Sequence, residues 1–193
     1  MTERPKIGLI QGSIREGRFN DVITRWAMAG LAARGFAITV IDPADAELLP
    51  VQTGDKAAVA ALRRRLHGLD GYVIVTPEYN HAAPGQLKTL IDSASREWEA
   101  KPVGFISYGG LSGGLRAVES LRIVLAELHA VALRDTVSFS SPWNRFDAAG
   151  TLIDQDDAVR SGEALAAFAT RLRWWIETLS AAAAREPYRE RTA

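Results

Sequence analysis

The sequence predicts an α/β fold, a doubly wound parallel sheet of five strands with helices on both faces. Five apolar runs of strand length alternate with five amphipathic segments of helical length, and no internal repeat or linker interrupts them. A chain of 193 residues, 47% of them hydrophobic, is long enough for one domain with a sizeable core. We therefore expect a single domain over residues 1–184 and a flexible charged tail over residues 185–193.

The predicted strands are short apolar runs, several of which end at a turn residue. The second ends at Asp42-Pro43 and the third at Pro77, which suits proline because it cannot donate to a sheet ladder. The fifth is more polar than the others and is expected at an edge of the sheet. In chain order, the five runs are Lys6–Gln11, Ala37–Ile41, Tyr72–Thr76, Val103–Ser107 and Leu133–Phe139.

The predicted helices are recognised by apolar side chains at helical spacing. The first stops at Gly35, the second covers about residues 55–67, and the third opens near Pro84. The fourth follows a glycine-rich loop, and the fifth covers about residues 156–180. A buried stripe is expected in the third helix, at Leu87, Leu90, Ile91, Ala94 and Trp98. The apolar residues that mark the other helices are Phe19, Val22, Ile23, Trp26, Ala29 and Ala33, which share one face of the first; Val118, Leu121, Leu125 and Leu128, which share one face of the fourth; and Leu165, Phe168, Leu172, Trp175, Ile176 and Leu179 in the fifth.

Composition excludes several classes of function. Lys and Arg number 23, as do Asp and Glu, and this balance argues against general binding to nucleic acid or an anionic membrane. The absence of cysteine excludes disulfides and thiol chemistry, and three scattered histidines make a metal site unexpected. No apolar stretch reaches the roughly 18 residues of a membrane span, and Met1 to Lys6 lack the pattern expected of a secretory leader. We expect a soluble cytoplasmic protein without a bound metal.

The loop after the first strand, residues 12–20, has the composition of an anion site. It reads GSIREGRFN and leads into a helix, whose first N–H groups and dipole favour a negative ligand. Ser13 can bond a phosphate oxygen, and Arg15 and Arg18 can offset its charge. Asn20 can act as a helix cap or as a further donor. Neither a Walker P-loop nor a GxGxxG fingerprint is present, so Asp42 is interpreted as a turn residue and not as a ribose ligand.

Two further loops at strand ends suit a flat ligand. Residues 77–85 read PEYNHAAPG and are stiffened by two prolines. Residues 107–116 read SYGGLSGGLR, with four glycines that let a backbone lie close to a ring. The carboxyl ends of parallel strands share one edge of a sheet, so the three loops are expected to form one extended site. Its cationic end suits phosphate, and its other end suits a hydrogen-bonding heterocycle.

The motifs GSIREGRFN, TPEYNHAAPGQLKTLID and SYGGLSGGLRA resemble those of the NADPH-dependent FMN reductase family, and the resemblance covers nearly the whole chain. It implies a flavodoxin-like sheet of strand order 2-1-3-4-5. By resemblance, the first motif holds the FMN phosphate and the other two enclose the isoalloxazine and ribityl chain, largely through backbone groups. The residues implied are Ser13, Arg15, Arg18 and Asn20; Pro77, Glu78, Tyr79 and Asn80; and Ser107, Tyr108, Gly109, Gly110, Gly113 and Gly114.

The resemblance also implies the reaction. Hydride passes from NADPH or NADH to bound FMN, and the electrons then pass to a flavin, a quinone or a similar small-molecule acceptor. FMN carries the chemistry, so no residue is named as an obligatory acid or base. A homodimer or homotetramer is expected. The alternative is a flavodoxin-like electron carrier, or a flavin-binding sensor, without direct NAD(P)H turnover. The family often carries serine where this chain has Ala82, and asparagine where it has Thr89.

Overall fold

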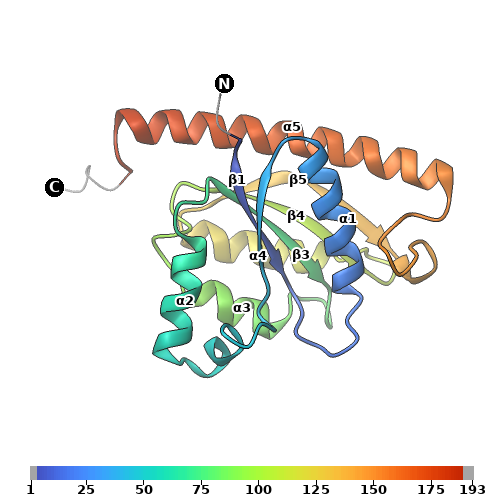
Figure 1. Ribbon diagram of the computed structural model, residues 1–193, viewed down its shortest axis with the longest axis horizontal. Helices are drawn as coiled ribbons and strands as arrows, with labels where there is room; N and C mark the ends of the chain where they lie inside the picture. The colour runs from blue at the N-terminus through green and yellow to red at the C-terminus, as the bar shows by residue number, and fades with distance from the viewer. Residues whose placement is uncertain (1–3, 189–193) are drawn as a thin grey trace.

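A computed structural model, described here for residues 4–188, contains the expected five-stranded parallel sheet in the order β2-β1-β3-β4-β5 (Figure 1). The predicted flavodoxin-like order is therefore confirmed, and β5 lies at the edge as expected. The strands are β1 (Lys6–Gln11), β2 (Ala37–Ile41), β3 (Gly71–Pro77), β4 (Pro102–Gly109) and β5 (Val131–Ser140). The first two match their predicted bounds, whereas the other three extend beyond them at both ends.

Helices cover both faces of this sheet (Figure 1). Helices α1 (Asn20–Ala33) and α5 (Gln155–Arg185) pack on one face, and α2 (Lys56–Leu66), α3 (Gly85–Asp92) and α4 (Leu115–Glu127) pack on the other. Two short 3₁₀ turns, η1 (Leu49–Thr53) and η2 (Pro142–Asn144), complete the described elements. The side chains of Asp55 and Asp154 cap α2 and α5 by accepting from the third backbone N–H beyond them, both at 2.8 Å.

The two cores follow from strand periodicity. Along β3, Tyr72 and Ile74 face α2, α3 and α4, while Val73 and Val75 face α1 and α5. The central strands are buried on both faces, which is why they read as nearly continuous apolar runs. Neither the 31-residue α5 nor another helix of residues 4–188 is long and apolar enough to cross a bilayer.

Two predicted helices end differently in the structure. The stripe expected to continue to Trp98 leaves the helix at Asp92, where the Ser93 hydroxyl donates to the Thr89 carbonyl at 2.7 Å. Trp98 is nevertheless fully buried in the core, where its indole N–H is satisfied by the Ile91 carbonyl at 3.0 Å. The last helix continues to Arg185, which shortens the expected tail. Within that tail, the Tyr188 hydroxyl lies 2.8 Å from His129 Nδ1, and residues 189–193 lie outside the described range.

Candidate functional site

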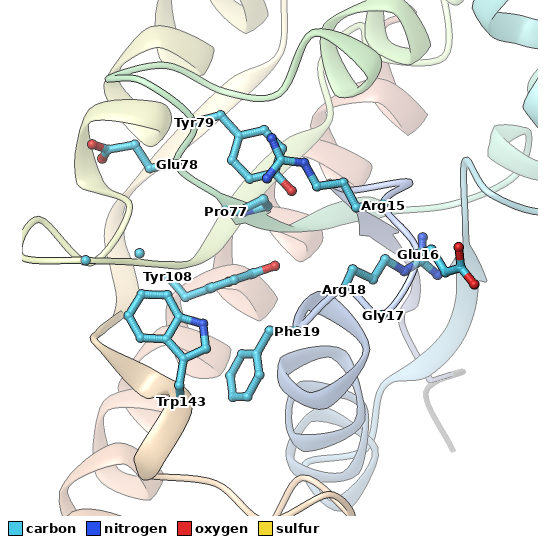
Figure 2. A pocket seen from close by; sticks show the side chains of 12 residues that line it. Arg15, Glu16, Gly17, Arg18, Phe19, Pro77, Glu78, Tyr79, Tyr108 and Trp143 are labelled. Atoms are coloured by element: carbon cyan, nitrogen blue, oxygen red, sulfur yellow. The ribbon is translucent and has the colours of Figure 1, made fainter.

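A cavity of about 510 Å³ opens at the carboxyl edge of the sheet, where the loops after β1, β3 and β4 meet (Figure 2). This is the switch point of the fold, because the chain runs outward from β1 to β2 and then returns to β3. All three predicted loops therefore contribute to one site. The cavity is lined by Arg15, Glu16, Gly17, Arg18, Phe19, Pro77, Glu78, Tyr79, Tyr108, Gly109, Gly110 and Trp143.

Of the two arginines in the first loop, Arg15 is the one whose charge remains available to a ligand. Its guanidinium lies 3.7 Å from the centre of the Tyr79 ring, and within residues 4–188 it forms no ion pair. The backbone N–H groups of Glu16, Gly17 and Arg18 donate no hydrogen bond within the same range. A cation beside several unused N–H donors at the start of a helix is a suitable arrangement for an anion.

Arg18 lines the cavity, but its charge is already offset. Its guanidinium donates to Asp21 Oδ1 at 2.8 Å and to both carboxylate oxygens of Asp42, and it also bonds the Ser13 carbonyl. The Arg18 side chain is 9% exposed, and the hydrogen bond to Asp42 is the main cause that raises its pKa above the ordinary value. This differs from the expectation of two free cations. Asp42 lies beyond β2 and is a partner of this arginine as well as a turn residue.

Ser13 and Asn20 lie behind the cavity wall, and both are fully buried. The Ser13 hydroxyl lies 2.9 Å from the Tyr79 hydroxyl and accepts from the Arg15 N–H, so it joins the first two loops. Asn20 donates from Nδ2 to the Val75 carbonyl at 2.9 Å, while its Oδ1 has no partner in the described structure. The cap alternative for Asn20 is wrong, because the α1 cap is Phe19 and Asn20 is the first helical residue.

The second loop presents backbone to the cavity and turns its charge away. Pro77, Glu78 and Tyr79 line the cavity, but Figure 2 shows the Glu78 carboxylate pointing away from its centre. That carboxylate accepts from the Ser112 hydroxyl at 2.7 Å and from Arg116 Nε at 2.6 Å. Burial alone would raise the pKa of Glu78, but these hydrogen bonds lower it below its ordinary value. Glu78 thus connects the second loop to the third.

A tight turn over residues 79–82 follows the part of the second loop that lines the cavity. Asn80 and His81 both adopt positive φ, 49° and 69°, between two hydrogen bonds that join Tyr79 and Ala82. Asn80 is not among the residues that line the cavity. His81 is exposed, and no contact joins it to the carboxylate of Glu78 in the described structure.

The glycine loop is divided into a ligand-facing part and a supporting part. Tyr108, Gly109 and Gly110 line the cavity. Gly113 and Gly114 lie behind it at φ of 60° and 85°, where a Cβ on Gly114 would lie 2.8 Å from backbone atoms of Tyr108. The hydroxyl of Ser107, which is fully buried, donates to the Gly113 carbonyl at 2.8 Å. Gly113, Gly114 and Ser107 therefore shape the loop and do not line the cavity.

The cavity also contains residues outside the predicted set: Glu16, Gly17, Phe19 and Trp143. The first three belong to the first motif, so their position could have been anticipated. Trp143 comes from η2, after β5, and lies outside all three motifs. The available signal was a Pro-Trp pair directly beyond the fifth strand, at the edge where the other loops meet. Residues 4–188 contain no cluster of three or more His, Asp or Glu placed to hold a metal ion.

Comparison with known proteins agrees with this geometry. Residues 5–144 match the family model described as NADPH-dependent FMN reductase. A 2-hydroxy-1,4-benzoquinone reductase of a Burkholderia species is 30% identical, over 78% of this chain and 87% of its own. An NAD(P)H-dependent FMN reductase of Pseudomonas aeruginosa is 31% identical, over 93% and 99%. The solved structure of the NAD(P)H:(acceptor) oxidoreductase FerB from Paracoccus denitrificans has a TM-score of 0.68 at 22% identity, over 90% and 98%.

Proposed function

The chain belongs to the NADPH-dependent FMN reductase family and is a flavin-dependent NAD(P)H oxidoreductase, and we propose that it passes the electrons to a quinone-type acceptor. The observation that carries the proposal is the single cavity shared by the three loops, with a cation and free N–H donors at one end and glycine backbone at the other. The named activity of the Burkholderia relative supports the acceptor class.

The residues of the cavity fit FMN. At the cationic end, Arg15 and the unpaired N–H groups of residues 16–18 can bind the phosphate, with Ser13 fixing the loop behind them. At the ring end, the Gly110 N–H donates no hydrogen bond in the described structure, and a Cβ on Gly110 would meet nothing within 4 Å. A flat heterocycle can therefore approach this backbone closely.

Bound FMN supplies a two-electron carrier that accepts hydride from NAD(P)H and returns two electrons to an acceptor. The chain's own contribution is position and electrostatics. The Glu78 clamp to Ser112 and Arg116 holds the second and third loops at a fixed separation. Backbone N–H groups on the glycine loop can stabilise negative charge that develops on a ring. No side chain of this cavity is required as an acid or base in this scheme.

We also propose that the protein forms a homodimer or homotetramer. Large apolar side chains lie exposed on the glycine loop and α4: Leu111 is 97% exposed, and Leu115 and Ile123 are also exposed. Such side chains in one region favour contact with another protein surface. Light scattering of the FMN-loaded protein at micromolar concentration tests this, and a monomeric mass would contradict it.

The experiment that tests the function is an anaerobic visible spectrum of the FMN-loaded protein during sequential additions. NADPH, or NADH in a parallel sample, is expected to bleach the flavin band. Subsequent addition of 1,4-benzoquinone is expected to restore the band and to yield hydroquinone. An oxidised flavin band that persists after addition of either nucleotide would instead favour the electron carrier or sensor. Bleaching that benzoquinone does not reverse would refute the acceptor class alone.

A further inference from the structure

Trp143 is a large ring left partly in water at the rim of the cavity. Trp143 is 54% exposed, and Figure 2 shows its indole directed toward the cavity, beside Phe19 and below Tyr108 in that view. The other four tryptophans each contact another aromatic ring: Trp26 with Phe139, Trp98 with Tyr72, and Trp174 with Trp175. Within residues 4–188, Trp143 has no ring partner.

The turn that carries Trp143 is held firmly on both sides. On one side, Ser141 donates its backbone N–H to the Gly109 carbonyl at 2.7 Å, and the Ser140 hydroxyl donates to the Gly110 carbonyl at 2.9 Å. On the other side, Arg145 forms a two-point ion pair with Asp157 of α5, at 2.8 and 2.7 Å. These contacts tie η2 both to the glycine loop and to the long helix, so the indole stands on a rigid support.

Backbone strain accompanies this support. Ser141 adopts φ of 45°, a left-handed conformation that is uncommon for a residue other than glycine. Such conformations persist where the surroundings impose them, and they occur often beside ligand sites. The left-handed residue directly precedes Pro142 and Trp143, so it sets the direction in which the turn leaves β5. The strained residue Ser141 therefore directs the turn that places the Trp143 indole, which has no ring partner, at the cavity.

We propose that Trp143 is the residue that stacks on the ring of a planar, conjugated electron acceptor of the quinone type and so sets the preference of the site for that class. This inference rests on the proposed function. A half-exposed indole gains most from a flat partner, because stacking buries its face and adds an aromatic interaction beyond the buried area. Its rigid support reduces the entropy lost when the partner binds. NAD(P)H depends less on such a contact, because its ribose and phosphate groups supply other interactions.

The test measures binding separately from turnover. Equilibrium dialysis of 1,4-naphthoquinone against the oxidised, FMN-loaded protein is carried out for the wild type and for Trp143→Ala, Trp143→Phe and Trp174→Ala. Trp174 is the matched control, because it is 57% exposed but does not line the cavity. We expect the Kd to rise about tenfold in Trp143→Ala, to rise less in Trp143→Phe, and to be unchanged in Trp174→Ala. An unchanged Kd in Trp143→Ala would overturn the proposal.

Two further measurements distinguish an acceptor contact from other roles. In steady state, Trp143→Ala should raise the KM for naphthoquinone by a similar factor and raise the KM for NADPH less. An FMN titration should show a smaller change in affinity than the quinone shows. A loss of FMN affinity equal to the loss of quinone affinity would assign the indole to the flavin and overturn the proposal. Failure of the wild type to reduce quinones would refute the proposed function, whereas the dialysis would still decide whether Trp143 contacts the ring.

Discussion

The two ends of the cavity are each stiffened by an arginine–carboxylate clamp, and the two clamps have different consequences for a ligand. At the first loop, Arg18 is enclosed by Asp21 and Asp42, which removes one cation from the reach of an anion. At the glycine loop, Glu78 is 6% exposed and holds Arg116, which is 48% exposed, with its charge directed away from the ring end. A charged residue beside a ligand site is therefore a ligand contact only if its own partners leave it available.

The largest expected loss of stability follows from breaking the ion pair between Arg18 and Asp42 at the first loop. Arg18→Met leaves the Asp42 carboxylate, whose side chain is 16% exposed, without its cation. Removing one partner of a largely buried pair should lower the free energy of unfolding by about 3 kcal/mol. Urea denaturation measures this value. The double variant Arg18→Met/Asp42→Asn should recover part of the loss, and a loss under about 1 kcal/mol in the single variant would contradict the clamp.

A smaller loss of stability is expected from substitutions at Gly114, in the supporting part of the third loop, and at Gly110, in its ligand-facing part. Gly114→Ala adds a Cβ 2.8 Å from the Tyr108 backbone at positive φ, and should cost about 2 kcal/mol of unfolding free energy. Gly110→Ala adds a Cβ that meets nothing within 4 Å, and should cost under about 0.5 kcal/mol. Thermal or urea unfolding compares them. Equal losses of stability in the two variants would remove the distinction.

The smallest effect concerns the second clamp and its pH dependence. Glu78→Gln removes a charge-assisted hydrogen bond to the half-exposed Arg116 and should cost about 1 kcal/mol at neutral pH. Because folding lowers the pKa of Glu78, its contribution is present above the ordinary carboxyl value of 4.5 and is lost as pH falls through the lowered folded-state pKa. The stability difference between wild type and variant should therefore shrink in acid. A difference that is constant from neutral pH into that range would contradict this role.

The fold could be predicted from the sequence more completely than the roles within the site. Strand and helix periodicities are local, so Lys6–Gln11 and Ala37–Ile41 emerge with their observed bounds. The position of the site follows from the same pattern, because strand ends share one edge. The end of a helix is harder to predict where a side chain bonds the backbone. At the end of α3, for example, the Ser93 hydroxyl donates to the Thr89 carbonyl in the last turn.

Individual roles depend on partners that are distant in sequence. Arg18 resembles Arg15 in its local motif, and only the fold brings it to Asp42, 24 positions away. Likewise, Ser13 has the composition of a phosphate ligand, yet its hydroxyl lies against Tyr79, 66 positions away. Trp143 carries no motif at all and joins the cavity only because η2 is tied to the glycine loop. Local sequence identifies candidates, and tertiary contacts decide which of them face a ligand.

We propose that Arg15, and not Arg18, supplies the available positive charge at the phosphate end of the FMN site. The most direct test is an FMN titration of the wild type, Arg15→Ala and Arg134→Ala, the last a control at a side chain that is 93% exposed and outside the cavity. Loss of one charge-assisted contact should weaken FMN binding in Arg15→Ala about tenfold or more, roughly 1.5 kcal/mol, with a larger deficit at low salt. Arg134→Ala should bind as the wild type does. Equal FMN affinity in all three proteins would contradict this role of Arg15.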